Sequence, residues 1–184
     1  MGLMNKLPRT KTRLRHRLIT LLLGLILSAQ LLAVDQINEY QIKAAFLYNF
    51  IAFTQWPEGI DQTLNLCVYG KDYFGQEIDK LQAKSVDNNN IKVLRLTSLE
   101  KSKECHVLFI SKSAIDDLPN VLASLQGEPI LTIADSPEAA ANGVIINMSL
   151  TQNKVSFNVN LESARSVKLD ISSRLLQLAT KVYQ

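Results

Sequence analysis

Six short apolar runs with strand character recur between residues 64 and 160, and this recurrence restricts the possible folds more than any other feature. Two of them, CHVLFIS (105–111) and PILTIAD (129–135), are almost wholly apolar, as expected of strands buried on both faces of a parallel sheet. Strands that alternate with helices favour an α/β domain with a mostly parallel sheet. The other four runs are LNLCVYG (64–70), IKVLRLTS (91–98), VIINMSL (144–150) and KVSFNVN (154–160).

Most of the segments between these runs are predicted to be helical. Apolar residues recur at helical intervals in 74–84, and residues 114–126 predict a helix around Pro119 that this proline could break. Residues 137–143 predict one helical turn, and 161–183 predict a long helical segment, as one helix or two. The last two strand runs flank residues 151–153, which indicates an antiparallel hairpin.

This order of elements predicts a three-layer α/β sandwich. Short, right-handed connections favour a mostly parallel sheet in flavodoxin-like order. The expected additions are a C-terminal antiparallel hairpin and a long C-terminal helix.

The stretch YQIKAAFLYNFIAFTQWP (40–57) is apolar at most positions but too short and too polar to span a bilayer. We interpret 37–53 as a buried helix, ended by Pro57, in preference to a docking face for another protein. Its predicted core residues are Phe46, Leu47, Phe50 and Ile51, and its predicted surface residues are Lys43 and Asn49.

The first 33 residues have the pattern of a secretory signal peptide. Basic residues without acidic ones precede an apolar stretch, LITLLLGLILSAQLLA (18–33), which is shorter than a comfortable transmembrane helix. We therefore predict a signal peptide over 1–33, cleaved near Ala33, and a single domain over 34–184; an uncleaved anchor is the alternative. No cysteine directly follows the apolar stretch, so a lipoprotein anchor is not expected.

Removal of this segment reverses the sign of the net charge. The whole chain has 20 Lys and Arg against 17 Asp and Glu, but six of the basic residues and no acidic ones lie in residues 1–33. Residues 34–184 therefore carry 14 basic and 17 acidic residues, a net charge of −3. The basic whole-chain balance belongs to the targeting segment and does not indicate nucleic-acid binding.

Two cysteines, Cys67 and Cys105, remain after such processing. An even number in an exported protein suggests a disulfide, and two buried free thiols are the alternative. In a flavodoxin-like order the strands that hold them are neighbours, so a cross-strand bond is geometrically possible.

The sequence offers little material for catalysis. Beyond the signal segment the chain has one histidine, His106, within an apolar strand, where a structural role is more common than a catalytic one. Cys105 and His106 are adjacent and point to opposite faces of a strand, which makes a shared zinc site awkward. There is no G-x-S-x-G motif, no phosphate-binding loop, and no aspartate at the end of 105–111 to accept a phosphoryl group as in receiver domains. We expect no enzymatic activity, metal or cofactor.

Two longer stretches carry a resemblance to a known family. YQIKAAFLYNFIAFTQWP and VSFNVNLESARSVKLDISSRLLQLA (155–179) closely resemble the terminal signatures of the YfiR-like family of bacterial periplasmic regulators. LNLCVYG, CHVLFIS and ILTIAD between them are also similar, so the resemblance covers nearly all of the mature chain. Cys67 and Cys105 fall where a structural disulfide of the family would lie; the second cysteine pair of some members is absent.

The resemblance implies a binding role. Such proteins bind the periplasmic sensor domain of a membrane diguanylate cyclase and repress cyclic di-GMP synthesis, and an OmpA-like outer-membrane lipoprotein can sequester them. The partner could instead be another membrane sensor such as a histidine kinase, and a homodimer is also possible. The other hypotheses are a small-ligand-binding protein, a periplasmic enzyme that uses His106, and a structural protein of the envelope.

We predict the partner-binding surface at the end of the last strand run and the turn beyond it. Phe157, Val159 and Leu161 would point inward along the strand, which leaves two asparagines on its other face. Three charged residues follow at helical spacing. The candidate residues are Asn158, Asn160, Glu162, Arg165 and Lys168; a solvated edge with an ordinary helix cap is the alternative reading of each.

Overall fold

The fold is organised by five parallel strands that lie side by side in the order β4-β2-β5-β6-β7. The computed structural model describes residues 39–57, 60–151 and 154–184. Numbered along the chain, these strands follow the order 2-1-3-4-5, so the predicted flavodoxin-like order is confirmed. Their bounds are β2 (Thr63–Tyr69), β4 (Asn89–Leu96), β5 (Val107–Ile110), β6 (Leu131–Ala134) and β7 (Ile146–Thr151).

Three further strands complete an eight-stranded sheet. β8 (Lys154–Asn160) pairs antiparallel with β7, which confirms the predicted hairpin, and β10 (Lys181–Tyr183) pairs parallel with β8. At the opposite edge β3 (Ser85–Val86) pairs antiparallel with β4. The turn between them places Asp87 and Asn88 at positive φ, a conformation that these residue types tolerate in tight hairpins. The sequence predicts no strand over residues 85–86.

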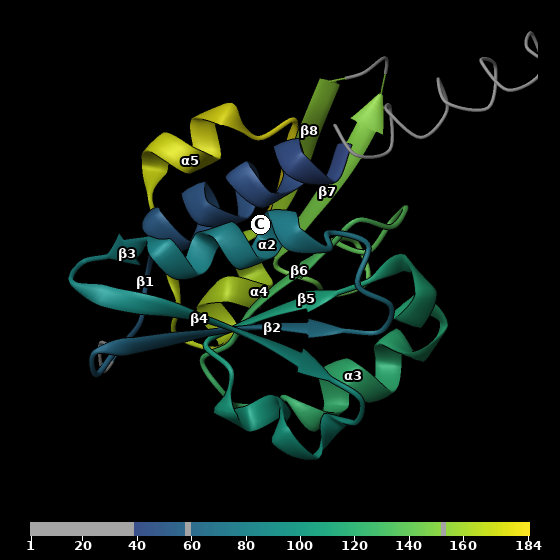
Figure 1. Ribbon diagram of the computed structural model, residues 1–184. Coiled ribbons are helices and arrows are strands. Elements are labelled where there is room, and N and C mark those ends of the chain that lie inside the picture. Colours follow the sequence, from purple (N-terminus) through teal and green to yellow (C-terminus); the bar gives the residue numbers. More distant parts are fainter. Residues whose placement is uncertain (1–38, 58–59, 152–153) are drawn as a thin grey trace, which may run out of the picture. The chain divides into compact units, whose positions relative to one another are not determined.

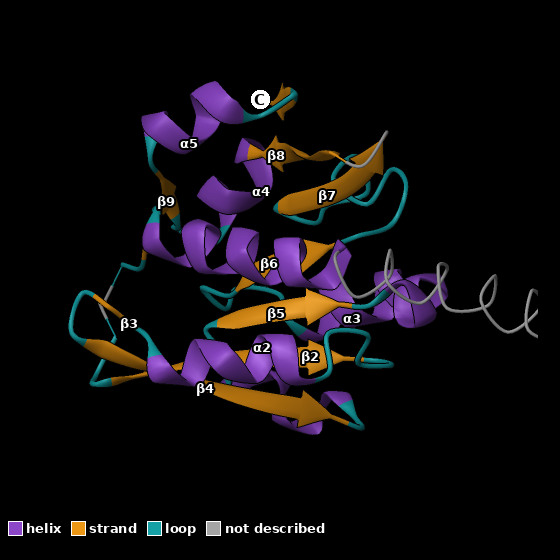
Figure 2. Cartoon of the chain, turned by 45° about the horizontal axis from the view of Figure 1, so that its top comes forward, coloured by secondary structure: helices purple, strands orange, loops and turns teal. Residues whose placement is uncertain are grey.

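Helices cover both faces of the sheet, as Figures 1 and 2 show. The helix of residues 39–52 packs on one face together with α2 (Gln76–Asp79), its 3-10 continuation η1 (Lys80–Ala83), α4 (Leu161–Ser166) and α5 (Ser173–Leu178). The 3-10 helices η2 (Leu99–Glu104) and η3 (Lys112–Asp117) pack on the other face with α3 (Leu118–Ser124). The three-layer architecture is thus confirmed.

The alternation of side chains along the strands divides the core into two layers. In β5, Val107 and Phe109 join the layer under the helix of residues 39–52, while Leu108 and Ile110 join the layer under α3. All four are buried, which accounts for the nearly continuous apolar run in the sequence.

The helix of residues 39–52 is a core element, as predicted. Leu47, Phe50 and Ile51 are fully buried and Asn49 is exposed. The prediction for Lys43 was wrong, because this residue is only 3% exposed and lies against the end of β6. Phe46 is half-buried and its ring lies 6.1 Å from that of Phe157 in β8.

The predicted long C-terminal helix is replaced by two short ones. α4 ends at Ser166, and Lys168 adopts a left-handed conformation with φ of 60°. Backbone bonds from Lys168 and Leu169 back to α4 close its last turn. The chain then forms β9 (Asp170–Ile171) before α5 begins after Ser172, whose side chain caps it. The alternative of two helices over 161–183 is thus confirmed, but the helical spacing did not locate the break, because a lysine stands where glycine would normally mark the end of a helix.

A small second sheet forms at two places where the chain leaves helical geometry, after the helix of residues 39–52 and between α4 and α5. β1 (Thr54–Gln55) pairs antiparallel with β9, Thr54 opposite Ile171 and Gln55 opposite Asp170. The segment after the first described helix and the segment between α4 and α5 are therefore tied together. Neither two-residue strand is long enough to produce a pattern in the sequence.

The expected signal peptide, residues 1–33, lies outside the described residues. Within the part of the chain that the structure describes, no helix is long and apolar enough to cross a membrane.

Candidate functional site

The usual ligand position of a doubly wound sheet is the crevice at the carboxyl ends of the strands where their order reverses, here β2 and β5. In this protein the chain itself fills that crevice. Gly70, directly after β2, has φ of 90°, and a Cβ atom there would lie 2.9 Å from the Cβ of Ala114 and from Oγ of Ser113. Ser113 also accepts a hydrogen bond from the backbone N–H of Lys71 at 2.8 Å. The loops after β2 and β5 are thus in close contact.

A buried polar cluster lies nearby, where the helix of residues 39–52 meets the end of β6. The ammonium group of Lys43 lies 2.7 Å from Oδ2 of Asp135 and 2.5 Å from Oε1 of Glu39. The hydroxyl of Tyr40 donates to the same Oδ2 at 2.9 Å. Burial, together with the neighbouring carboxylate of Asp135, raises the pKa of the Tyr40 hydroxyl. The lysine in the apolar helix therefore ties the helix to the sheet.

The predicted disulfide between Cys67 and Cys105 is present. Cys67 lies in β2 and Cys105 lies two residues before the start of the neighbouring strand β5, with the two Cα atoms 5.9 Å apart. The residues are 0% and 4% exposed, so the bond is enclosed in the layer under α3. This burial favours a structural disulfide over one that is accessible to redox partners.

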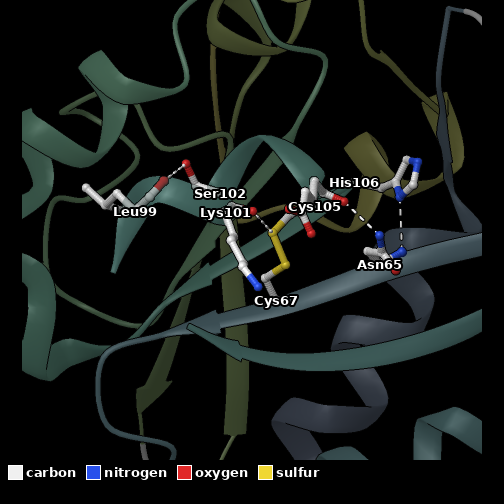
Figure 3. The surroundings of a disulfide bond; sticks show 8 residues. Asn65, Cys67, Leu99, Lys101, Ser102, Cys105 and His106 are labelled. Atoms are coloured by element: carbon white, nitrogen blue, oxygen red, sulfur yellow. Dashed lines mark hydrogen bonds between the residues drawn. A yellow bond between two sulfur atoms is a disulfide. The ribbon is translucent and has the colours of Figure 1, made fainter. Parts of the chain in front are cut away.

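His106 belongs to the structural surroundings of this disulfide (Figure 3). Its ring Nδ1 accepts a hydrogen bond from the backbone N–H of Asn65 at 3.0 Å, and the backbone N–H of His106 donates to the carbonyl of Asn65. The Asn65 side chain donates in turn to the carbonyl of Glu104 at 2.7 Å. Burial lowers the pKa of His106, so the neutral ring that accepts this hydrogen bond is favoured. The ring is oriented by the backbone and has no neighbouring nucleophile among its hydrogen-bond partners.

The predicted partner-binding residues divide into two groups. Glu162, Arg165 and Lys168 are exposed on α4 and the turn beyond it. Glu162 and Arg165 are three positions apart in the helix and so lie on one face of it. Together with Lys168 they form what we call the α4 face, a charged surface that is open to solvent.

The two asparagines of β8 differ from each other. Asn158 is half-buried on the strand. Asn160 is only 8% exposed: its Oδ1 accepts the N–H of Ser163 at 2.8 Å as the cap of α4, and its Nδ2 donates to the carbonyl of Ala140 at 2.8 Å. Asn160 therefore caps α4 and is largely buried, and its predicted contact with a partner stays a prediction. An asparagine just before a helical segment is a cap signal that the sequence already contained.

A cleft of about 420 Å³ opens beside α4, on the side next to the α4 face. Its walls are the end of α3 with the following turn and the residues Ser163, Ser166 and Val167 of α4 and its end. The cleft arises because β7 pairs with β6 only through Ile146 and Asn147, so the first half of β6 has no strand on that side. Nothing in the sequence pointed to this opening.

Over the described ranges, no group of three or more His, Cys, Asp or Glu side chains is placed to hold a metal ion. The described site thus consists of an α/β scaffold cross-linked by a disulfide, two loops in close contact at the point where the strand order reverses, the charged α4 face and an adjoining cleft.

Comparison with known proteins gives the family. Residues 40–180 match the model of the YfiR/HmsC-like family, and the chain belongs to this family of periplasmic regulatory proteins. The disulfide fits an exported protein. No curated protein sequence matches the chain.

Solved structures resemble the chain in fold alone. A conserved domain protein from Vibrio cholerae O1 biovar El Tor shares 9% identity at a TM-score of 0.55, over 78% of this chain and 60% of that protein. The ABC domain from Streptococcus pneumonia in complex with L-Trp shares 9% identity at a TM-score of 0.49, over 65% of this chain and 55% of that one. The chain thus spans between a half and two thirds of the length of either structure.

Proposed function

We propose that this protein is a non-enzymatic periplasmic regulator that binds the periplasmic sensor domain of a membrane diguanylate cyclase and represses cyclic di-GMP synthesis. It is exported by a cleaved signal peptide, and an OmpA-like outer-membrane lipoprotein sequesters it to release the cyclase. Membership of the YfiR/HmsC-like family over residues 40–180 is the observation that carries the proposal.

The described site supports a binding role over a catalytic one. The switch-point crevice is filled by Gly70 and Ser113, and His106 is engaged with the backbone of Asn65. The α4 face, in contrast, exposes Glu162 and Arg165 on the helix and Lys168 in the turn beyond it, while the other side of the helix packs into the core through Leu161 and Ala164. A rigid helix with exposed charges suits the specific recognition of a protein surface.

The test is to measure cyclic di-GMP in host cells with and without the gene. Deletion is expected to raise the nucleotide, and the exported protein is expected to reverse the rise while a version without residues 1–33 does not. An unchanged level on deletion would contradict repression of a cyclase.

The α4 face is tested in the same cells with the pair Glu162→Ala and Arg165→Ala. The matched control is Glu100→Ala with Lys101→Ala, two exposed residues of η2 on the other side of the sheet. We expect only the first pair to lose repression and co-purification with the cyclase, at an unchanged amount of folded protein. Loss with both pairs, or with neither, would remove the α4 face from the proposal.

The cleft beside α4 favours a second candidate function, the binding of a small ligand that modulates a membrane sensor such as a histidine kinase. Its volume of about 420 Å³ lies within the ordinary range of ligand sites, and Thr132, Ser163 and Ser166 add polar groups to an apolar lining. Mass spectrometry of the protein purified under native conditions would test this: a co-purifying molecule that is lost on the substitution Ser166→Phe supports a ligand, and its absence argues against one.

A further inference from the structure

Two lysines meet over one aromatic ring beyond the carboxyl ends of neighbouring strands. Lys71 lies two residues after β2, and Lys112 lies two residues after β5. Their ammonium groups lie 5.0 Å and 4.6 Å from the centre of the Tyr73 ring. Both lysines are exposed, and we call them the lysine pair. The structure thus holds two like charges next to one ring, although such charges repel each other.

The lysine pair lies where a doubly wound sheet usually holds its ligand. β2 and β5 are adjacent and parallel, with Tyr69 opposite Ile110 at their carboxyl ends, and Figure 1 shows both arrows pointing to the same edge of the sheet. The strand order reverses between them, and flavodoxin-like sheets bind a flavin nucleotide at this point. Gly70 and Ser113 fill the crevice itself. A ligand here would therefore lie on the rim, which the lysine pair forms.

The ring beneath the lysine pair is itself fixed to the core. Tyr73 stacks on Tyr40 with the ring centres 5.6 Å apart, and Tyr40 is only 5% exposed. The Tyr40 ring also packs edge-on against Phe74 at 5.0 Å, and the Lys112 ammonium group lies 5.8 Å from the centre of the Tyr40 ring. Because the rings restrict the two lysine side chains, less entropy is lost when the lysines bind a ligand.

Neither member of the lysine pair forms an ion pair with another described residue. The carboxylate next to Lys71 in the sequence, Asp72, is engaged elsewhere, because it accepts from Nε of Arg95 at 2.8 Å and from the N–H of Phe74 at 2.7 Å. Asp135, which binds Tyr40, is buried and paired with Lys43. Two exposed positive charges thus remain uncompensated, in a domain whose net charge over 34–184 is negative.

We propose that the lysine pair binds a phosphate monoester, the dianionic group of a small soluble molecule. One dianion neutralises both ammonium groups, whereas a carboxylate or a phosphate diester carries a single charge and leaves one of them unpaired. The terminal phosphate oxygens accept hydrogen bonds from ammonium donors, and lysine is a common phosphate ligand. This site is built from other elements than the α4 face and the cleft beside it, and it does not rest on the proposed function.

The test compares methyl phosphate with dimethyl phosphate at about pH 7.5, where the monoester is a dianion and the diester carries one charge. Each is added to the purified exported protein, in which the lysines are labelled with carbon-13, and the NMR signals of the lysine Cε atoms report binding beside each ammonium group. We expect methyl phosphate to shift the signals of the lysine pair saturably and to bind about tenfold more tightly than the diester. Equal affinity for the two probes would overturn the proposal.

The variants Lys71→Gln and Lys112→Gln assign the site. Each is expected to weaken the binding of methyl phosphate about threefold, and the double variant about tenfold, because a single exposed charge contact contributes little. The matched control, Lys92→Gln with Lys101→Gln at exposed positions of β4 and η2, is expected to bind as the parent does. Unchanged binding by the first double variant, or an equal loss with the control, would remove the site. Circular dichroism of every variant excludes loss of the fold as the cause.

Tyr73 is a positioning residue in this proposal, and two substitutions separate that role from packing. Tyr73→Phe keeps the ring beneath the ammonium groups, so its affinity for methyl phosphate should equal that of the parent. Tyr73→Leu keeps an apolar side chain but removes the ring, and it should weaken binding about twofold or more. Equal affinity of these two variants would show that the ring does not hold the lysine pair in place.

Vesicles distinguish a soluble phosphate from a lipid head group. Vesicles of phosphatidylglycerol and phosphatidylcholine in equal amounts are expected to bind the protein no better than phosphatidylcholine alone, because phosphatidylglycerol is a singly charged diester. Vesicle binding that requires Lys71 and Lys112, without binding of methyl phosphate, would assign the lysine pair to a membrane surface and overturn the proposal. None of these assays contains a cyclase. Their failure would leave the proposed repression of cyclic di-GMP synthesis standing, and a failed deletion experiment would leave the phosphate site standing.

Discussion

The ammonium group of Lys43 lies 2.7 Å from the carboxylate of Asp135, and the two side chains are 4% and 1% exposed. The pair joins the helix of residues 39–52 to the residue that follows β6, across 92 positions of the chain. Tyr40 donates to the same carboxylate oxygen, while Oδ1 of Asp135 has no partner among the described residues. The carboxylate therefore depends on Lys43 for its charge compensation.

Replacement of Lys43 by methionine is expected to destabilise the fold strongly. The substitution keeps the length of the side chain but leaves the charge of Asp135 buried and unpaired, which costs about 3–5 kcal/mol in comparable cases. Urea denaturation, followed by circular dichroism, would measure the fall in the free energy of unfolding.

The double variant Lys43→Met with Asp135→Asn separates charge from packing. Asparagine keeps an acceptor for Tyr40 and removes the charge, so most of the lost stability should return. A double variant as unstable as Lys43→Met alone would show that packing, rather than the unpaired charge, causes the loss.

This pair also shows where sequence reasoning about the fold reaches its limit. The strand order followed from local patterns, because each buried strand is itself an apolar run such as 105–111 or 129–135. Lys43 offered no such signal, since its burial depends on Asp135, far away in the sequence. β1 and β9 were missed for the same reason: each is two residues long and exists only because the other lies beside it.

Removal of the disulfide should destabilise the protein without changing its fold. Cys67 and Cys105 are separated by 38 positions, and the chain-entropy model assigns a cross-link of this span about 4 kcal/mol. We expect the free energy of unfolding of the pair Cys67→Ala and Cys105→Ala to fall by about this amount. A loss below about 1 kcal/mol would mean that strain in the native bond offsets the entropic gain.

The stability of the protein should also fall in mild acid because of His106. Burial lowers the pKa of the folded ring below the value of about 6.5 in the unfolded chain, so the unfolded chain takes up the proton first. The contribution to stability is complete above about pH 6.5 and is lost as the pH falls from there through the lowered folded pKa. Protonation of Nδ1 would also remove the acceptor of the Asn65 N–H.

The variant His106→Asn tests this explanation. Its Oδ1 can accept the hydrogen bond of Asn65 but does not titrate, so its free energy of unfolding should change less than that of the parent between about pH 7.5 and pH 5.5. Equal pH dependence in the two proteins would assign the acid sensitivity to other groups.

The prediction of partner-binding residues was limited because a polar residue near the start of a helix can either face solvent or cap the helix. Glu162 and Arg165 lie on the exposed side of α4, as the helical spacing indicated. Asn160 shares their polarity, but its position directly before α4 gives it a capping role that the strand pattern concealed. The alternation with Phe157 and Val159 predicts an exposed side chain only within the strand. β8 ends at Asn160, so the alternation no longer predicts exposure for this residue.

Asn160 and its neighbour Asn158 offer a direct test of this distinction. Asn160→Ala removes the cap of α4 and leaves the carbonyl of Ala140 without its donor, so we expect a loss of about 1–3 kcal/mol in the free energy of unfolding. Asn158→Ala, on the half-buried position two residues earlier, should change it by only about 0.5 kcal/mol. Chemical denaturation of both variants measures the difference. Equal stability of the two would contradict a structural role of Asn160 and return it to the set of candidate partner contacts.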